Sequence, residues 1–203
     1  MTLLPSHPNE WIDRNQVYTF RFEGQTHEGY AGDVLASALW ANDIRFTGRS
    51  FKYHRPRGIY SMSGLDVNLL VEDRQSTNVR GDLRPLEDGL ELRSVNTAGG
   101  LKYDWYRFSQ WLSRFMPVGF YYKAFHTPRK LFPFYEKQLR QAAGLGKISA
   151  KWAVRSTPKE YAFCDVLVVG SGPAGLSAAL SAADQGADVL LVDEMSRSGK
   201  PSL

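Results

Sequence analysis

The chain has 203 residues, of which 43% are hydrophobic and 23% are charged, a balance typical of a polypeptide that folds around a core, and its length suits two small domains. Its single cysteine, Cys164, excludes an intramolecular disulfide, a four-cysteine zinc site and a four-thiolate iron–sulfur cluster. The net charge of +4 is uneven, because residues 101–160 hold 12 Lys and Arg against 3 Asp and Glu. With no secretory signal or membrane span in the sequence, we expect a cytoplasmic protein.

The first part of the chain has the pattern of an α+β module, which we assign to residues 1–98. Aromatic and β-branched residues alternate on both sides of Glu23 and Gly24, which predicts a hairpin over residues 17–30. Asp33 is the expected N-cap of a short helix that follows the hairpin. Further strands are expected at residues 68–71 and 90–95.

Aromatic residues dominate the next part, which we assign to residues 99–160 as a basic helical connector. Residues 101–135 hold 13 of the 26 aromatic residues of the chain. Apolar side chains at helical spacing predict an amphipathic helix that ends before Pro117, namely Trp105, Phe108, Leu112 and Phe115. A second helix is predicted over residues 133–143, with Gly144 as its end.

The mixture of basic and aromatic residues in this connector has two interpretations. Aromatic rings and cations together can bind single-stranded nucleic acid by stacking and charge. Alternatively, the aromatic rings hold the connector against neighbouring domains or subunits while the Lys and Arg charges stay in water. We favour the second, because helical periodicity accounts for about half of the aromatic residues, and we expect neither a nucleic-acid nor a membrane partner.

The basic stretch at residues 52–57 also has two interpretations. His54, with Arg55 and Arg57, could contact a phosphate, a carboxylate or a flavin on a partner. The same side chains could instead form a solvated or subunit-facing loop that Pro56 stiffens. We favour the structural interpretation, because no acidic or nucleophilic residue nearby in the sequence completes a catalytic set.

From Cys164 onward the sequence predicts a βαβ unit, and we assign residues 161–203 to it. A buried-type strand, a GSGPAG loop, a helix that ends at Gly186 and a second strand follow one another directly. In this context the G-x-G-x-x-G pattern predicts a dinucleotide-binding site. Asp193 ends the second strand, where an acidic residue accepts hydrogen bonds from the adenosine ribose and disfavours a 2′-phosphate.

Each residue of this predicted site has a specific task. Gly170 permits the tight turn, Gly172 lets the backbone approach the pyrophosphate, and Gly175 lets helix and strand pack closely. Pro173 begins the helix without an N–H, so Ser171 and Ala174 are the expected phosphate donors. The predicted cofactor-binding residues are Gly170, Ser171, Gly172, Pro173, Ala174, Gly175, Asp193 and Glu194. On motif evidence the cofactor is NAD or FAD, and no residue is assigned as catalytic or as a metal ligand.

Several motifs in this order resemble the N-terminal portion of the α subunit of heterotetrameric sarcosine oxidases. They are EGYAGDVLASAL, GRSFKYHRPRGIYS, PVGFYYKAF, RQAAGLGK and the glycine loop with its flanking strands. The resemblance spans about Pro8 to Gly199. It implies a β-grasp, 2Fe-2S ferredoxin-like module followed by the truncated start of a Rossmann-type FAD/NAD-binding domain, that is, α+β followed by α/β.

The ferredoxin resemblance also implies where a cluster would be held. Cluster-bearing relatives place cysteines with C-x4-C-x2-C spacing after a Gly-Ile-Phe-like lead, which is Gly58-Ile59-Tyr60 here. The three cysteine positions are then Ser61, Asp66 and Leu69, none of which is cysteine. We therefore expect no [2Fe–2S] cluster and a structural or docking role for the module.

The resemblance implies an oxidoreductase subunit that binds NAD, in a hetero-oligomeric complex whose other subunits oxidise sarcosine at FAD. Because the chain ends at Leu203, just after the second Rossmann strand, we expect a fragment that carries an incomplete dinucleotide site and no catalytic residue of its own. Two alternatives stay open: a non-enzymatic scaffold or docking fragment, and the equivalent subunit of an N-methylglutamate or opine dehydrogenase.

Overall fold

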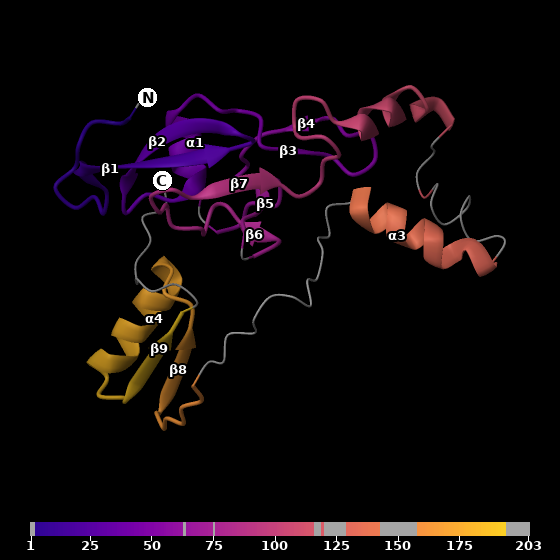
Figure 1. Ribbon diagram of the computed structural model, residues 1–203. Helices are drawn as coiled ribbons and strands as arrows, with labels where there is room; N and C mark the ends of the chain where they lie inside the picture. The colour runs from indigo at the N-terminus through magenta and orange to yellow at the C-terminus, as the bar shows by residue number, and fades with distance from the viewer. Residues whose placement is uncertain are drawn as a thin grey trace. The chain divides into compact units, whose positions relative to one another are not determined.

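The computed structural model describes residues 3–62, 64–74, 76–115, 119, 129–142 and 158–193. The chain forms two compact units, residues 1–152 and 153–203. Figure 1 shows both units.

The first unit contains a five-stranded sheet, in the order β2-β1-β7-β5-β6. Only β1 and β7 pair in parallel among these strands, and the other neighbours are antiparallel. Two short strands, β3 and β4, form a separate hairpin. The elements of this part are β1 (Asp13–Phe22), β2 (Gln25–Ala31), α1 (Leu35–Ala41), β3 (Gly48–Arg49), β4 (Pro56–Arg57), β5 (Leu70–Glu72), β6 (Val79–Arg80) and β7 (Glu91–Ser94).

The first hairpin agrees with the prediction. Glu23 and Gly24 connect β1 and β2 with φ angles of 52° and 79°, the left-handed pair that characterises a type I′ hairpin turn. Both carboxylate oxygens of Glu23 are also used, because Oε1 accepts the N–H of Ser94 at 2.7 Å and Oε2 accepts that of Leu101 at 2.9 Å. The turn therefore holds the chain where it leaves the sheet.

Helix α1 packs on the sheet and forms the core with it (Figure 1). The helix begins one residue later than predicted, since Val34 and not Asp33 is its N-cap. Asp33 still contributes, because its buried carboxylate accepts hydrogen bonds from the Val34 N–H and the Ser37 hydroxyl. The fully buried side chains of the cluster include Phe20, Leu35, Leu39, Leu69, Val71 and Leu92.

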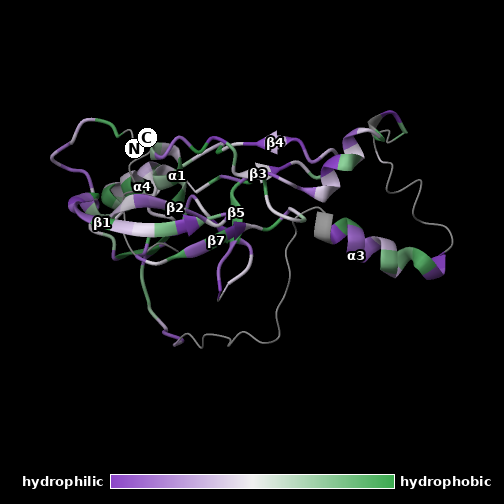
Figure 2. Ribbon diagram, turned by 45° about the horizontal axis from the view of Figure 1, so that its top comes forward, coloured by the Kyte–Doolittle hydropathy of each residue, from purple (hydrophilic) through white to green (hydrophobic). Residues whose placement is uncertain are grey.

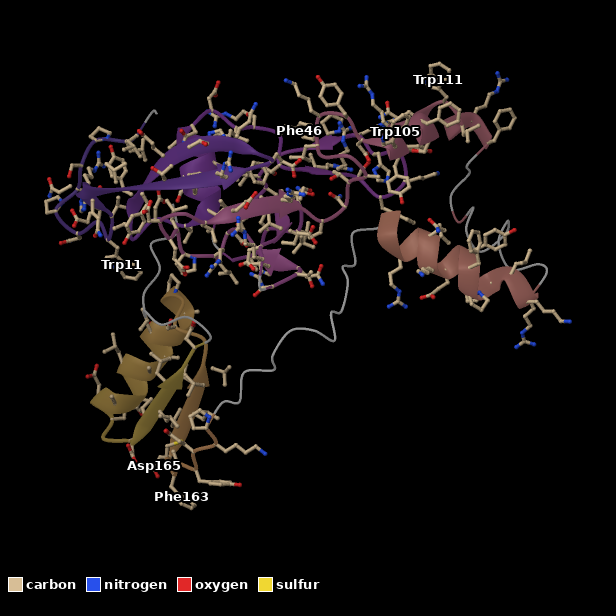
Figure 3. All side chains as sticks on the ribbon, viewed as in Figure 1. Trp11, Phe46, Trp105, Trp111, Phe163 and Asp165 are labelled. Atoms are coloured by element: carbon tan, nitrogen blue, oxygen red, sulfur yellow. The ribbon has the colours of Figure 1, made fainter. Side chains whose placement is uncertain are left out.

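The predicted helix over residues 105–115 is wrong in type. The chain there forms two 3₁₀ helices, η1 (Trp105–Gln110) and η2 (Ser113–Phe115). Their apolar side chains stay largely exposed, Trp105 at 81% and Trp111 at 82% (Figure 3). A short α-helix depends on burial of its amphipathic face, and nothing in the described residues buries this one.

The second predicted connector helix is present and begins one residue earlier than predicted. A 3₁₀ turn, η3 (Arg129–Leu131), leads into α3 (Phe132–Ala142), where hydrophobic and hydrophilic residues share the helix (Figure 2). Arg140 and Glu136, one turn apart, form an ion pair on its surface. The predicted helix end at Gly144 lies outside the described residues.

The second unit is the predicted βαβ unit. It consists of β8 (Val166–Val169), α4 (Pro173–Asp184) and β9 (Val189–Val192), with the strands parallel and in register from Val166 opposite Val189. Helix α4 covers one face of this two-stranded sheet (Figure 1). Val169 and Leu167 are 78% and 56% exposed, so part of the hydrophobic strand surface stays uncovered within this unit.

Candidate functional site

The glycine loop lies at the carboxyl ends of the parallel strands. It connects Val169, the last residue of β8, to Pro173, the first residue of α4, and the N–H of Gly170 donates to the carbonyl oxygen of Val192 at 2.7 Å. Phe163 and Asp165 lie at the opposite end of β8 (Figure 3). In doubly wound sheets, ligands bind outside the carboxyl ends of the strands, so this loop is the candidate site.

Two of the three glycines are required by the fold itself. Gly170 has a φ of +105°, which side chains rarely tolerate. A Cβ on Gly175 would collide with the carbonyl oxygen of Gly170, so any larger residue would push α4 away from the loop. These two positions need glycine whether or not a ligand binds.

Gly172 is different, because the described residues give no reason for a glycine there. Its φ of −67° suits any residue, and a Cβ would have no neighbour within 4 Å. It is the N-cap of α4, whose first turn directs unpaired N–H groups and a partial positive charge outward. The open space above Gly172 therefore fits the close approach of a pyrophosphate.

Asp193 closes the other side of the loop. Its Oδ2 atom accepts the backbone N–H of Ser171 at 2.6 Å and the Ser171 hydroxyl at 2.9 Å. The strand pairing thus brings the predicted ribose acceptor to the predicted phosphate loop, although 22 residues separate them in the sequence.

The same contacts change the expected phosphate donors. The Ser171 N–H, which we expected to face a phosphate, is used by Asp193. The first helical hydrogen bond runs from the N–H of Leu176 to the carbonyl oxygen of Gly172, so the amides of Ala174 and Gly175 are the ones left in the first turn. Pro173 occupies the start of the helix, as predicted, and Glu194 lies outside the described residues.

The three positions that would hold a cluster in the first unit carry no set of metal ligands. Leu69 is fully buried in the hydrophobic core, and Asp66 is 2% exposed and surrounded by backbone amides. In the described part of the chain, no three or more His, Cys, Asp or Glu residues are grouped as for a metal ion. These residues do not fit a [2Fe–2S] cluster.

Sequence reasoning missed a buried polar cluster at the start of the aromatic segment, by which we mean residues 101–115 of the connector. Our preferred interpretation treated the loop around His54 as solvated or subunit-facing, but His54 is 2% exposed and Asp104 is 4% exposed. The His54 Nδ1 atom lies 2.7 Å from Asp104 Oδ2, and the Arg49 Nε atom lies 3.5 Å from the same oxygen. Arg55 and Arg57 are exposed, as that interpretation expected.

Burial and a neighbouring carboxylate act in opposite directions on the pKa of His54. Burial lowers the pKa of His54 and outweighs the attraction of the Asp104 carboxylate, which acts in the opposite direction. Arg49 also donates to the carbonyl oxygens of His54 and Leu101. A sequence signal did exist, because Asp104 is the one acidic residue within the otherwise basic residues 101–115.

Comparisons with known families match both units. Residues 15–97 match the 2Fe-2S iron-sulfur cluster binding domain family, and residues 165–202 match the FAD binding domain family. No helix among the described residues is long and apolar enough to cross a membrane.

Comparisons with individual proteins extend over nearly the whole chain. "Sarcosine oxidase subunit alpha" of Rhizobium meliloti is 46% identical over 193 residues, which is 93% of this chain and 20% of that protein. The protein of the same name from Corynebacterium sp. strain U-96 is 28% identical over 93% of this chain and 15% of its own length. The crystal structure of L-proline dehydrogenase from P. horikoshii aligns with 92% of this chain and 26% of its own, at 19% identity and a TM-score of 0.48. The chain thus spans about a fifth of the length of the first of these relatives.

Proposed function

Because this chain is homologous to sarcosine oxidase α subunits over 93% of its length, we propose that it acts as the N-terminal part of such a subunit, in a complex that oxidatively demethylates sarcosine. Within that complex, residues 1–98 supply a β-grasp module, residues 99–160 a connector, and residues 161–203 the first βαβ unit of a dinucleotide site. The partners are the other subunits of a hetero-oligomeric amine oxidase. This chain contributes binding residues and no catalytic group.

The proposed dinucleotide-binding role rests mainly on one observation. Gly172 is a glycine that the described fold does not need, at a helix N-terminus with open space in front of it. A requirement for close approach by a ligand explains that glycine. The amides of Ala174 and Gly175 would face the pyrophosphate, and Asp193, already fixed by Ser171, would accept the ribose hydroxyls.

The proposal also includes which dinucleotide, FAD or NAD, the glycine loop binds. The FAD binding domain match over residues 165–202 supports FAD. The resemblance to sarcosine oxidases favours NAD, and Asp193 suits the unphosphorylated ribose of either dinucleotide. When bound, such a cofactor supplies hydride-transfer chemistry, while the residues of this chain hold its pyrophosphate and ribose.

The test is an NMR titration of the ¹⁵N-labelled chain with ADP, which both dinucleotides contain, and separately with NAD and FAD. Amide shifts detect weak binding, which matters because a two-stranded unit holds only part of a dinucleotide site. We expect the amide signals of Ala174 and Gly175 to shift with ADP while those of residues 17–30 stay unchanged. Unchanged signals at the glycine loop with all three ligands would contradict the proposal.

A second candidate function is a docking module without a nucleotide. The exposed aromatic side chains of Trp105 and Trp111 favour it, because such surfaces in soluble proteins commonly mark protein interaction sites. A Trp105→Ala/Trp111→Ala variant would then lose co-purification with the other oxidase subunits while the parent chain shows no ADP shifts. The equivalent subunit of an N-methylglutamate or opine dehydrogenase would be identified by the amine that the assembled complex oxidises.

A further inference from the structure

The carboxylate of Asp66 collects the backbone amides of the loop in which cluster-bearing relatives hold their cysteines. Oδ2 accepts the N–H groups of Tyr60 at 2.5 Å and Ser61 at 2.9 Å. Oδ1 accepts those of Asn68 at 2.6 Å and Leu69 at 2.8 Å. Two amides on each oxygen make Asp66 the point on which both ends of this loop converge.

The carboxylate is buried without a cation among these contacts. Asp66 is 2% exposed, and its own N–H donates to Asp82 Oδ2 at 2.9 Å. Asp82 is itself fully buried, with the Arg80 guanidinium 3.7 Å away. Backbone dipoles therefore compensate the Asp66 charge, an arrangement that stabilises an anion and at the same time fixes the residues that donate to it.

Inward-facing backbone amides also suit an iron–sulfur cluster. Its sulfurs are anionic, and hydrogen bonds from the surrounding protein to those sulfurs set its properties. In this chain the donors include the amides of Ser61 and Leu69, which are the first and third cysteine positions, and the acceptor is the side chain at the second position.

We propose that the Asp66 carboxylate replaces the cluster as the buried anion that orders this loop. The proposal rests on the module having no cluster, and it explains how a ferredoxin-like loop keeps its shape without one. The residues on either side of Asp66 point outward, Leu65 at 71% and Val67 at 76% exposure, so the carboxylate also fixes which side chains this loop presents to a partner.

Hydrogen–deuterium exchange of the full chain tests this role with Asp66→Asn and Asp66→Ala. The amide of Asn can accept on one oxygen only, so one pair of donors should lose protection, whereas Ala should expose both pairs. We expect exchange at the affected amides of residues 60–61 and 68–69 to rise about ten-fold or more, the usual consequence of losing a hydrogen bond to a charged group. The control is Asp43→Asn, since Asp43 is an exposed carboxylate in a surface ion pair with Arg45.

Two outcomes overturn the proposal. One is parental protection of residues 60–69 in Asp66→Ala, and the other is an equal loss of protection in the β1–β2 hairpin, which would make Asp66 a general core residue. The absence of a cluster is tested separately, by the absorption spectrum and iron content of the parent chain after anaerobic reconstitution. A cluster spectrum would contradict that premise whatever the exchange data show.

Discussion

The imidazole Nδ1 atom of His54 lies 2.7 Å from the carboxylate of Asp104, joining two buried side chains that are 50 residues apart in the sequence. Asp104 also accepts the N–H groups of Ala98 and Tyr106 and begins η1. The Tyr106 ring packs on His54, with ring centroids 5.0 Å apart. This pair therefore attaches the aromatic segment to the β3–β4 hairpin.

We expect His54 to make stability depend on pH. Burial lowers the pKa of His54 in the folded state below the value of about 6.5 in the unfolded chain, so the unfolded chain binds the proton more readily. The free energy of unfolding is therefore undiminished above that pH and decreases as the pH falls through and below it. Burial lowers the pKa of His27 as well, which adds to the effect in the same direction. Melting temperatures at pH 7.5 and 5.5 should show a smaller acid-induced decrease in His54→Asn than in the parent.

Asn is chosen because the His54 backbone has a φ of +48°, which Asn tolerates better than most residues. His7→Asn, at an exposed position, is the matched control and should retain the parental decrease. An identical decrease in all three chains would rule out His54 as a source of the pH dependence.

The glycine loop should separate folding from binding. Gly175→Ala forces a collision with Gly170 and should destabilise the βαβ unit, whereas Gly172→Val, whose Cβ would have no neighbour within 4 Å, should leave it folded at the smaller cost of a poorer N-cap. We expect Gly172→Val to abolish the ADP-induced shifts of the neighbouring amides because the side chain fills the space for the pyrophosphate. Ser177→Val, at an exposed position on α4, is the control; retained ADP shifts in Gly172→Val would disprove the assigned role of this glycine.

Asp193→Asn should weaken binding of ADP-ribose by about ten-fold, since hydrogen bonds to a charged acceptor are stronger than those to a neutral one. The affinity is measured from amide shifts at increasing ligand concentration. Asp184→Asn removes the same charge from an exposed position at the end of α4 and should bind like the parent. Equal affinities of the two variants would remove Asp193 from the site.

Leu69→Ala should lower the free energy of unfolding by about 2–5 kcal/mol, because Leu69 is fully buried and packs in the hydrophobic cluster around α1. Leu65→Ala, four residues earlier and 71% exposed, should change it by less than about 0.5 kcal/mol. Urea denaturation of both variants measures the difference, and similar losses would contradict the placement of Leu69 in the core.

Local patterns account for the elements that sequence analysis predicted well. The Glu23–Gly24 turn, the α1 helix and the βαβ unit each have a strong periodic signal and suitable end residues. The strand predicted at residues 68–71 is present at Leu70–Glu72. Its shift follows from the Asp66 hydrogen bonds, which hold the amides of Asn68 and Leu69 outside the sheet ladder.

The remaining features depend on contacts between distant residues. Strands of two residues, such as β3 and β4, are too short for a periodic pattern, and hydrophilic Pro56 and Arg57 give no strand signal (Figure 2). Apolar residues do recur at helical spacing from Trp105 onward, but spacing alone does not tell whether another surface covers the apolar face. In the candidate site the motif identified the loop, whereas the bond from Ser171 to Asp193 required the strand pairing.

The Glu23 turn has a mechanical consequence. The N–H of Leu101 donates to Glu23, and the carbonyl oxygen of Leu101 accepts a hydrogen bond from Arg49. Side chains from two different hairpins therefore bind a single residue at the point where the chain leaves the sheet. Because Leu101 is itself part of the hydrophobic core, tension applied to the aromatic segment would act on both hairpins and on the core at this one residue. A chimera that grafted this segment onto another domain would need a carboxylate and a guanidinium at the same two places to fix where the segment departs.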